Sequence, residues 1–350
     1  MVKEADGGTG GLGDGGKEPE ANAPSPRLPV PPSGTESLLA VQLGPLRLKN
    51  PIVTASGTFG YGLEFTDWVD LARLGGLCTK GLSLRPHAGN EPPRICETPA
   101  GMLNAIGLQN IGVEAFLSEK LPRLRSMGAT VIANVRGDLE EDYVAIVKAL
   151  EGAQGLAAVE LNISCPNVEK GGMLFGNSPS ATASLVSRVR VATRFPLIVK
   201  LSPNAPDLVE SARAARTAGA DVLSLVNTFV GMAIDPETAR PRLSFGTGGL
   251  SGPAIKPLAV RMVYQVARAL PDTPLMGIGG ISSLSDVLEF LAAGATAIQV
   301  GTANFVEPGV SQRLVEELEQ YCLGRGIAAA SLVGRAHRTG PAPADAGAEG

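Results

Sequence analysis

The chain has 350 residues, of which 44% are hydrophobic and 18% are charged, and its formal net charge is −4. This composition indicates a soluble globular protein, long enough for one large α/β barrel or two average domains, without a basic surface for nucleic acid. The four cysteines form no CxxC pair, and two histidines exclude a histidine-rich metal site. Neither a secretory signal nor a stretch able to span a bilayer is found, so we expect a cytoplasmic protein without a membrane anchor.

Both ends of the chain differ in composition from its centre. Residues 1–35 are rich in Gly, Pro and acidic groups and nearly free of large apolar side chains, and residues 335–350 are similar. Such segments cannot bury enough apolar surface to offset the entropy of ordering. We therefore expect a disordered N-terminal extension (1–35), a barrel domain (36–325) and a disordered C-terminal tail (335–350).

The central region alternates between short apolar runs and amphipathic segments. Residues 38–48 predict a hairpin that turns near Gly44 and Pro45. Eight apolar runs follow, and seven of the eight intervals between or after them have a helical pattern, for example residues 64–76. Eight such units predict a (β/α)8 TIM barrel with a parallel sheet, and a doubly wound open sheet is the runner-up. The expected strands are Ile52–Ala55, Leu77–Lys80, Val131–Val135, Val159–Ile163, Leu197–Leu201, Val222–Val226, Leu275–Ile278 and Ala297–Val300.

The segment Arg85–Asn110, after the second expected strand, is too long for a plain loop between a strand and a helix. Long insertions in compact domains tend to be functional. We therefore expect an inserted hairpin or small lobe over the mouth of the barrel.

The fourth expected strand ends in an asparagine, and a Cys-Pro-Asn triplet and a Gly-Gly pair follow within the stretch VELNISCPNVEKGGMLF (residues 159–175). Barrel enzymes carry their catalytic groups at the carboxyl ends of the strands. A buried cysteine is more often a small apolar residue than a reactive one. Several other strands also end in polar or charged residues, which favours a site.

Two glycine-containing loops follow the last two expected strands, at Gly277–Ser282 and Val300–Phe305. Small residues ahead of a helix leave backbone N–H groups free for an anion, and barrels often bind phosphate after strands seven and eight. Glycine also occurs in tight turns that bind nothing. The prediction of a phosphate site therefore depends on finding two such loops, one after each of the last two expected strands.

Two lysines and several asparagines also lie at or near the carboxyl ends of expected strands. Lys80 and Lys200 could be salt-bridged structural residues, or they could give the pocket a positive charge for an anionic ligand or a flavin that becomes anionic on reduction. Amides suit a planar ligand such as a cyclic imide, although asparagine is also common in turns. A partly exposed Cys165 beside these cations could remove a carbon-bound proton without a histidine partner. The asparagines at or just after strand ends are Asn134, Asn162, Asn167 and Asn227, and Asn104 lies in the insertion.

Several short motifs follow one another along the chain. They are TASGTFG (Thr54–Gly60), NAIGLQN (Asn104–Asn110), NISCPN (Asn162–Asn167), VNT (Val226–Thr228), GGLSG (Gly248–Gly252) and the two glycine loops. Together these motifs resemble dihydroorotate dehydrogenase over about residues 38–324, and they occur in the order of that family. The cysteine in NISCPN is similar to that of the soluble class 1 enzymes, and the pattern around Gly171–Gly172 and Phe175–Gly176 is similar to class 1B.

The resemblance implies one FMN in the mouth of the barrel and dihydroorotate against it. Cys165 would be the base that takes a proton from C5 while a hydride leaves C6 for flavin N5, and Lys200 would stabilise the reduced flavin. The implied FMN contacts are Ser56, Lys80, Gly81, Asn134, Asn162, Lys200, Val226, Gly252, Gly279, Gly280, Gly301 and Thr302. The implied substrate contacts are Lys80, Asn104, Ala105, Ile106, Gly107, Leu108, Asn162, Asn227 and Thr228.

Class 1B further implies a partner subunit. An iron–sulfur flavoprotein with FAD and a [2Fe-2S] cluster would pass electrons to NAD, because this chain has no cysteine cluster of its own, and a homodimer within a heterotetramer is expected. Alternatives are a class 1A enzyme that uses fumarate, an FMN barrel acting on another dihydropyrimidine, a flavin-free aldolase or isomerase, and a barrel that only supports a partner.

Overall fold

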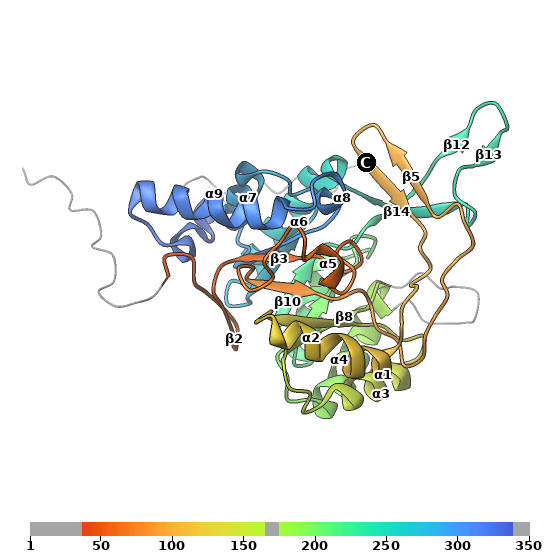
Figure 1. Cartoon of the computed structure of the whole chain (residues 1–350), viewed down its shortest axis with the longest axis horizontal. Coiled ribbons are helices and arrows are strands. Elements are labelled where there is room, and N and C mark those ends of the chain that lie inside the picture. Colours follow the sequence, from red (N-terminus) through yellow and green to blue (C-terminus); the bar gives the residue numbers. More distant parts are fainter. Residues whose placement is uncertain (1–36, 165–174, 339–350) are drawn as a thin grey trace, which may run out of the picture. The chain divides into compact units, whose positions relative to one another are not determined.

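A closed, eight-stranded parallel barrel lies at the centre of the computed structural model, which describes residues 37–164 and 175–338 (Figure 1). The strands follow one another around the barrel in chain order, and β16 pairs with β3 to close it. The predicted (β/α)8 fold is therefore confirmed. The barrel strands are β3 (Ile52–Thr54), β4 (Gly76–Cys78), β7 (Val131–Val135), β8 (Leu156–Asn162), β9 (Leu197–Lys200), β10 (Val222–Leu225), β15 (Leu275–Ile278) and β16 (Ala297–Val300).

Helices cover the outside of the barrel and bury the outward face of its strands. All five residues of β7 are buried, as a strand with both faces covered requires. Asp207 caps α5 and Ser283 caps α7 through their side chains, which fixes where these helices begin. The helices are α1 (Val113–Ala115), α2 (Leu121–Ser126), α3 (Glu140–Leu150), α4 (Pro179–Ala192), α5 (Leu208–Thr217), α6 (Lys256–Ala269), α7 (Leu284–Ala292), α8 (Ala303–Val306) and α9 (Val310–Arg325).

Shorter helical turns complete the chain. A π-helix, η2, continues α1 into α2, and the remaining turns are of the 3-10 type. These short elements are η1 (Leu63–Phe65), η2 (Phe116–Lys120), η3 (Phe175–Asn177), η4 (Pro253–Ile255), η5 (Ala329–Leu332) and η6 (Arg335–His337).

The interval after β3 differs from the sequence prediction. Residues 64–76 read as a helix, but the structure has only η1 there, followed by turns. The Asp70 side chain accepts the N–H of Ala72, and Lys49 and Asn50 donate to the carbonyls of Ala72 and Arg73. Side chains therefore make hydrogen bonds with backbone groups that would pair with each other in a helix. The helix predicted from the pattern of residues 64–76 is wrong.

A lobe lies at one end of the barrel (Figure 1). It is a four-stranded antiparallel sheet with the strand order β11-β14-β6-β5. The insertion after β4 contributes the hairpin β5 (Ile95–Thr98) and β6 (Gly101–Asn104), as expected. The other two strands of the sheet, β11 (Phe229–Met232) and β14 (Thr247–Ser251), come from the segment after β10, and the sequence did not predict them. Between them, β12 (Ile234–Asp235) and β13 (Arg240–Pro241) form a separate two-stranded sheet.

The ends of the described region pack on the barrel. The hairpin β1 (Val41–Leu43) and β2 (Leu46–Leu48) forms as predicted, and the N–H of Ala329 donates to Leu38. The tail expected from residue 335 differs from the structure, because the His337 ring stacks on Tyr264 at 4.2 Å between centroids. Residues 1–35 and 339–350, also expected to be disordered, lie outside the described residues. No helix in the described region is long and apolar enough to cross a membrane.

The close pairing of β6 with β14 generates a prediction for Gly101. A Cβ at this position would lie 2.0 Å from the carbonyl oxygen of Ser251, a backbone atom that cannot rotate away. We expect Gly101→Ala to lower the free energy of unfolding by about 1–3 kcal/mol, as overpacking does, measured by urea titration.

Gly324→Ala is the matched control, because nothing lies within 4 Å of a Cβ added at this position in α9. We expect it to leave stability unchanged or to raise it by up to about 1 kcal/mol, because alanine is the better helix former. Equal stability of the two variants would contradict the packing of the lobe described above.

Candidate active site

The predicted site residues lie at one end of the barrel, because the carboxyl ends of its parallel strands form a single rim. Asn134 lies within β7, and Asn162 and Lys200 are the last residues of β8 and β9. The following loops supply Ser56 after β3, Lys80 and Gly81 after β4, Val226, Asn227 and Thr228 after β10, Gly279 and Gly280 after β15, and Gly301 and Thr302 after β16. Cys165, Asn167 and the Gly171–Gly172 pair lie outside the described residues.

The lobe brings the predicted substrate segment to the β10 end of this rim. The Asn104 side-chain amide donates to the Gly249 carbonyl at 3.2 Å. A Cβ on Gly249 would lie 2.1 Å from the Thr228 hydroxyl, so only glycine permits this approach. Asn104 and Thr228, which are far apart in the sequence, thus both lie close to Gly249.

Residues Ala105–Leu108 are held within the lobe. The Ala105 N–H donates to the Arg94 carbonyl at 2.8 Å, and Asn90 bonds with the carbonyls of Ala105 and Ile106. Gly107 has φ +69° and Leu108 has φ +60°, which turns the chain sharply at this point. These hydrogen bonds hold the segment against residues 90–94, and its contact with a ligand stays a prediction.

Two of the predicted asparagines bond with each other. The Asn227 side-chain nitrogen donates to Asn162 Oδ1 at 3.1 Å, and the Ser164 N–H donates to the same oxygen at 3.3 Å. The Tyr143 hydroxyl donates to the Asn162 carbonyl at 2.7 Å, and Asn227 Oδ1 accepts from the N–H of Thr228. With its oxygen occupied, Asn162 has its side-chain N–H groups available, and these suit a carbonyl of a ligand.

Positive charge gathers at the same rim. Lys200 is only 5% exposed, and its ammonium group makes no hydrogen bond or ion pair with another described residue. Burial lowers the pKa of Lys80, and the nearby charge of Arg94 lowers it further. The sequence did not single out Arg94, because an arginine in a long polar insertion carries no pattern of its own. Cations in this arrangement are stabilised by an anionic ligand.

The glycine loops that follow β15 and β16 meet the end of β14. Gly280 has φ +71°, and a Cβ there would lie 2.8 Å from the Gly252 carbonyl oxygen. The Thr302 hydroxyl donates to the Ser251 hydroxyl at 2.8 Å. Within the described region, the N–H groups of Gly280, Ile281, Gly301 and Thr302 have no hydrogen-bond acceptor. This is the arrangement in which backbone amides bind a phosphate.

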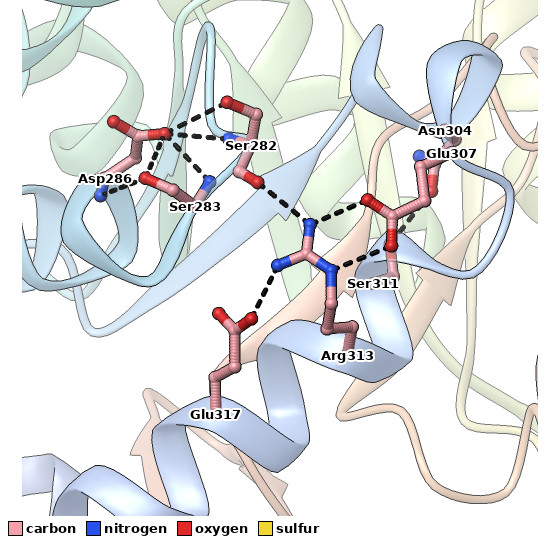
Figure 2. A network of polar contacts seen from close by, with 8 residues as sticks. All are labelled: Ser282, Ser283, Asp286, Asn304, Glu307, Ser311, Arg313 and Glu317. Carbon is pink, nitrogen blue, oxygen red and sulfur yellow. Dashed lines mark hydrogen bonds and ion pairs between the residues drawn. The ribbon is translucent and has the colours of Figure 1, made fainter.

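A polar network holds the loop after β15 in place (Figure 2). Asp286 Oδ2 accepts from the N–H groups of Ser282 and Ser283, each at 2.9 Å, and from both hydroxyls. Arg313 on α9 donates to the Ser282 carbonyl at 3.3 Å while it pairs with Glu307 and Glu317. The loop backbone is therefore fixed from both sides. The spacing of Ser283 and Asp286, typical of a capping box, was the available sequence signal.

The loop after β16 is held by a side chain of its own. Asn304 donates to the carbonyls of Val300 and Gly301 at 2.9 and 3.0 Å. Ser311 donates in turn to Asn304 Oδ1 at 2.9 Å (Figure 2). Because Ser311 and Arg313 both lie in α9, this helix positions both glycine loops.

A buried carboxylate inside the barrel was not among the residues predicted from the sequence. Glu160 in β8 has no exposed surface and accepts hydrogen bonds from Cys78, Asn134, Ser224 and Gln299. Burial raises the pKa of the Cys78 thiol well above its ordinary value, and the charge of Glu160 adds to this effect. A glutamate within an otherwise apolar strand was the signal that could have identified it.

The fold and the site define a (β/α)8 barrel enzyme with a cationic, amide-rich mouth beside loops suited to phosphate. Residues 38–322 match the sequence model of the family described as dihydroorotate dehydrogenase, and the chain belongs to this family of oxidoreductases.

Curated relatives cover most of the chain. It is 56% identical over 297 residues to a protein of Trichlorobacter lovleyi named dihydroorotate dehydrogenase B (NAD(+)), catalytic subunit. This match covers 85% of the present chain and 97% of the relative. Proteins of the same name from Geotalea uraniireducens and Geobacter sulfurreducens are 56% and 55% identical, and each match covers 83% of this chain and 95% of the relative.

Asp286 provides a test of the loop network. Lys256 pairs with both Asp286 and Glu289 at 2.8 Å, but only Asp286 also bonds with the Ser282–Ser283 backbone. We expect Asp286→Asn to lower the free energy of unfolding by about 1–2 kcal/mol in urea titrations, the usual effect of losing a cap. Glu289→Gln, the matched control, should change it by less than about 0.5 kcal/mol.

The same variant has a pH signature. Burial raises the pKa of the Asp286 carboxyl, but hydrogen bonds from Lys256, Ser282 and Ser283 outweigh burial and bring it to about 2, below its ordinary 3.8. Stabilisation by a group with a lowered pKa is present above the ordinary value and is lost as pH falls through the folded value. The stability difference between wild type and Asp286→Asn should therefore shrink below about pH 4. A difference that stays constant down to about pH 3 would contradict the assigned network.

Proposed function

We propose that this chain is an FMN-dependent catalytic subunit that oxidises dihydroorotate to orotate in de novo pyrimidine biosynthesis, in the cytoplasm. The observation that carries the proposal is the convergence of Lys80, Lys200, Asn134 and Asn162 with two glycine loops at one barrel rim, in a chain of this family. These groups supply positive charge, amide hydrogen bonds and backbone N–H donors. Those are the features needed for a planar imide-like ring that carries a phosphate.

The residues present fit FMN. Asn134 Oδ1 is buried without a hydrogen-bond partner in the described region, and a Cβ on Gly81 would lie only 3.1 Å from it. A glycine beside an unsatisfied acceptor leaves room for a donor on a ligand. The N–H groups of Gly280, Ile281, Gly301 and Thr302 suit the phosphate, and Gly252 and Gly279 complete the same group of loops. Ser56 and Val226 belong to the proposed FMN contacts by their positions at the rim.

Each proposed catalytic residue has a distinct chemical task. FMN, when bound, supplies an acceptor for the hydride that leaves C6 of dihydroorotate. Cys165, assigned from the sequence alone because it lies outside the described residues, would take the C5 proton as a thiolate. The buried ammonium group of Lys200 would stabilise the negative charge of the reduced flavin, because little water reaches this position to screen it. The asparagines and residues Asn104–Leu108 would orient the substrate so that the reacting carbon is correctly placed.

The onward electron transfer requires a partner. The described residues contain no group of three or more His, Cys, Asp and Glu arranged for a metal ion. A separate iron–sulfur flavoprotein with FAD and a [2Fe-2S] cluster would then deliver the electrons to NAD, within an assembly built on a homodimer of this chain. The names of the curated relatives specify NAD(+) and a catalytic subunit, which favours this acceptor over fumarate.

An anaerobic absorbance spectrum tests the proposal directly. The purified chain should show the bands of oxidised FMN, and dihydroorotate should bleach them in the absence of oxygen. A second addition of NAD or fumarate to the reduced chain, with and without the partner, identifies the acceptor. A colourless protein, or a flavin that dihydroorotate does not reduce, would contradict the proposed function.

The role of Cys165 leads to a prediction. Cys165→Ala should retain bound FMN but lose turnover by about 10²–10⁴-fold, the usual contribution of a general base, measured as flavin bleaching by dihydroorotate in single-turnover experiments. Cys96→Ala in β5 is the matched control, and its rate should equal that of the wild type. Undiminished bleaching in the Cys165 variant would remove the residue from the mechanism.

The buried charge of Lys200 leads to another prediction. Lys200→Met keeps most of the side-chain volume and removes the charge, so flavin reduction should slow by about 10²–10³-fold in stopped-flow measurements. Lys148→Met on the exposed face of α3 should leave the rate unchanged. Wild-type reduction kinetics in Lys200→Met would show that this cation does not assist the reaction.

A further inference from the structure

The Glu160 carboxylate connects five strands inside the barrel. Its Oε1 accepts from the Asn134 side-chain nitrogen at 2.7 Å and from the Cys78 thiol at 3.1 Å. Its Oε2 accepts from the Ser224 hydroxyl at 2.9 Å and from the Gln299 side-chain nitrogen at 2.7 Å. All four partners donate, as an ionised carboxylate requires.

Glu160 is fully buried, and transferring its carboxylate from water to the barrel interior costs free energy on folding. An apolar side chain could fill the same space without that cost. Stability alone therefore does not explain why a carboxylate occupies this position. The directional property of the group offers a reason, because a carboxylate accepts hydrogen bonds and cannot donate them when ionised.

The direction of the Asn134 amide follows from this property. An amide has one accepting and one donating end, and a carboxylate can bond only with the donating end. The NH2 group of Asn134 must face Glu160, so Oδ1 must face the opposite way. Asn134 Oδ1 is in fact buried and has no partner in the described region. This oxygen lies toward Gly81, the neighbour of Lys80 at the rim, because a Cβ on Gly81 would be 3.1 Å from it.

An oriented but unsatisfied acceptor requires a donor from a ligand. Leaving such an acceptor buried and unpaired is unfavourable, and a ligand N–H that reaches it removes that cost on binding. An amide free to rotate by half a turn would present NH2 as readily as oxygen and would not select for an N–H group. The only ring N–H of an oxidised flavin is at N3.

We propose that Glu160 is a positioning residue that locks the Asn134 amide so that its oxygen accepts the N3–H of the flavin. This inference rests on the proposed function, since it takes FMN as the ligand. Glu160 itself touches no ligand in this account. It acts through Asn134, and it specifies an imide-like N–H as the group that this part of the pocket recognises.

The first experiment changes the ligand and leaves the protein intact. The affinities of the flavin-free chain for FMN and for 3-methyl-FMN, which lacks the N3–H, are compared by flavin fluorescence. We expect the methylated flavin to bind about 10- to 100-fold more weakly, as when a buried acceptor loses its donor. Asn134→Leu should bind both flavins with nearly equal affinity, because it has no acceptor to discriminate between them.

The second experiment moves the carboxylate from β8 to β7. Asn134→Asp alone places two carboxylates against each other and should abolish measurable FMN binding. Adding Glu160→Gln restores complementarity, because the new glutamine can donate to the new aspartate while its oxygen still accepts from Ser224 and Gln299. The double variant keeps the total charge and turns an oxygen toward the ligand. It should recover FMN affinity to within about 10-fold of the wild type and discriminate against 3-methyl-FMN again.

Ser224→Ala is the matched control, because it removes one hydrogen bond from Glu160 without touching Asn134. It should lower stability slightly and leave the ratio of the two flavin affinities unchanged, whereas a purely structural role of Glu160 predicts similar effects for all variants of the cluster.

Two outcomes would overturn the inference while the proposed function stands: a wild type that binds both flavins equally, or a double variant that binds FMN no better than Asn134→Asp. A wild type that binds no FMN would instead overturn the proposed function, and this inference with it.

Discussion

The pairing of β16 with β3 is the constraint on which the site depends. It joins Val300 to Thr54 in register, with the Ala55 N–H donating to the Val300 carbonyl at 2.7 Å, and it closes the sheet into a ring. Because all eight strands run parallel, closure brings every strand end to one rim. The rim collects side chains from distant parts of the chain and leaves their backbones tied to a rigid sheet, which suits a site that must hold a flat ligand in one orientation.

Inside the ring, the buried polar groups are arranged around one carboxylate. The outward-facing apolar side chains supply the hydrophobic core between sheet and helices, so the interior can hold Glu160, Gln299 and Ser224 away from water. Their hydrogen bonds offset the cost of burial and give each amide a single direction. Stability and recognition are thus linked, because the carboxylate that bonds with these interior side chains also orients the Asn134 oxygen away from itself.

Outside the ring, α9 gives the phosphate-side loops their shape. Arg313 and Ser311 reach the loops after β15 and β16, and Asp286 binds the first of them from within (Figure 2). Asp286 occupies the N–H groups of Ser282 and Ser283, whereas those of Gly280 and Ile281 have no acceptor in the described region. The network therefore selects which backbone donors can meet an anion, although none of its side chains needs to touch one.

The sequence by itself determined the eight strands, the hairpin after β4 and the polar residues at strand ends, because apolar periodicity and local turn signals act over a few residues. Only the tertiary structure decided that β14 completes the lobe beside β6, that residues 64–76 form turns, and that Glu160 bonds with four distant side chains. These features depend on partners far apart in the sequence, so no local pattern encodes them. The direction of the Asn134 amide belongs to this second group, since the carboxylate that sets it lies on another strand of the closed ring.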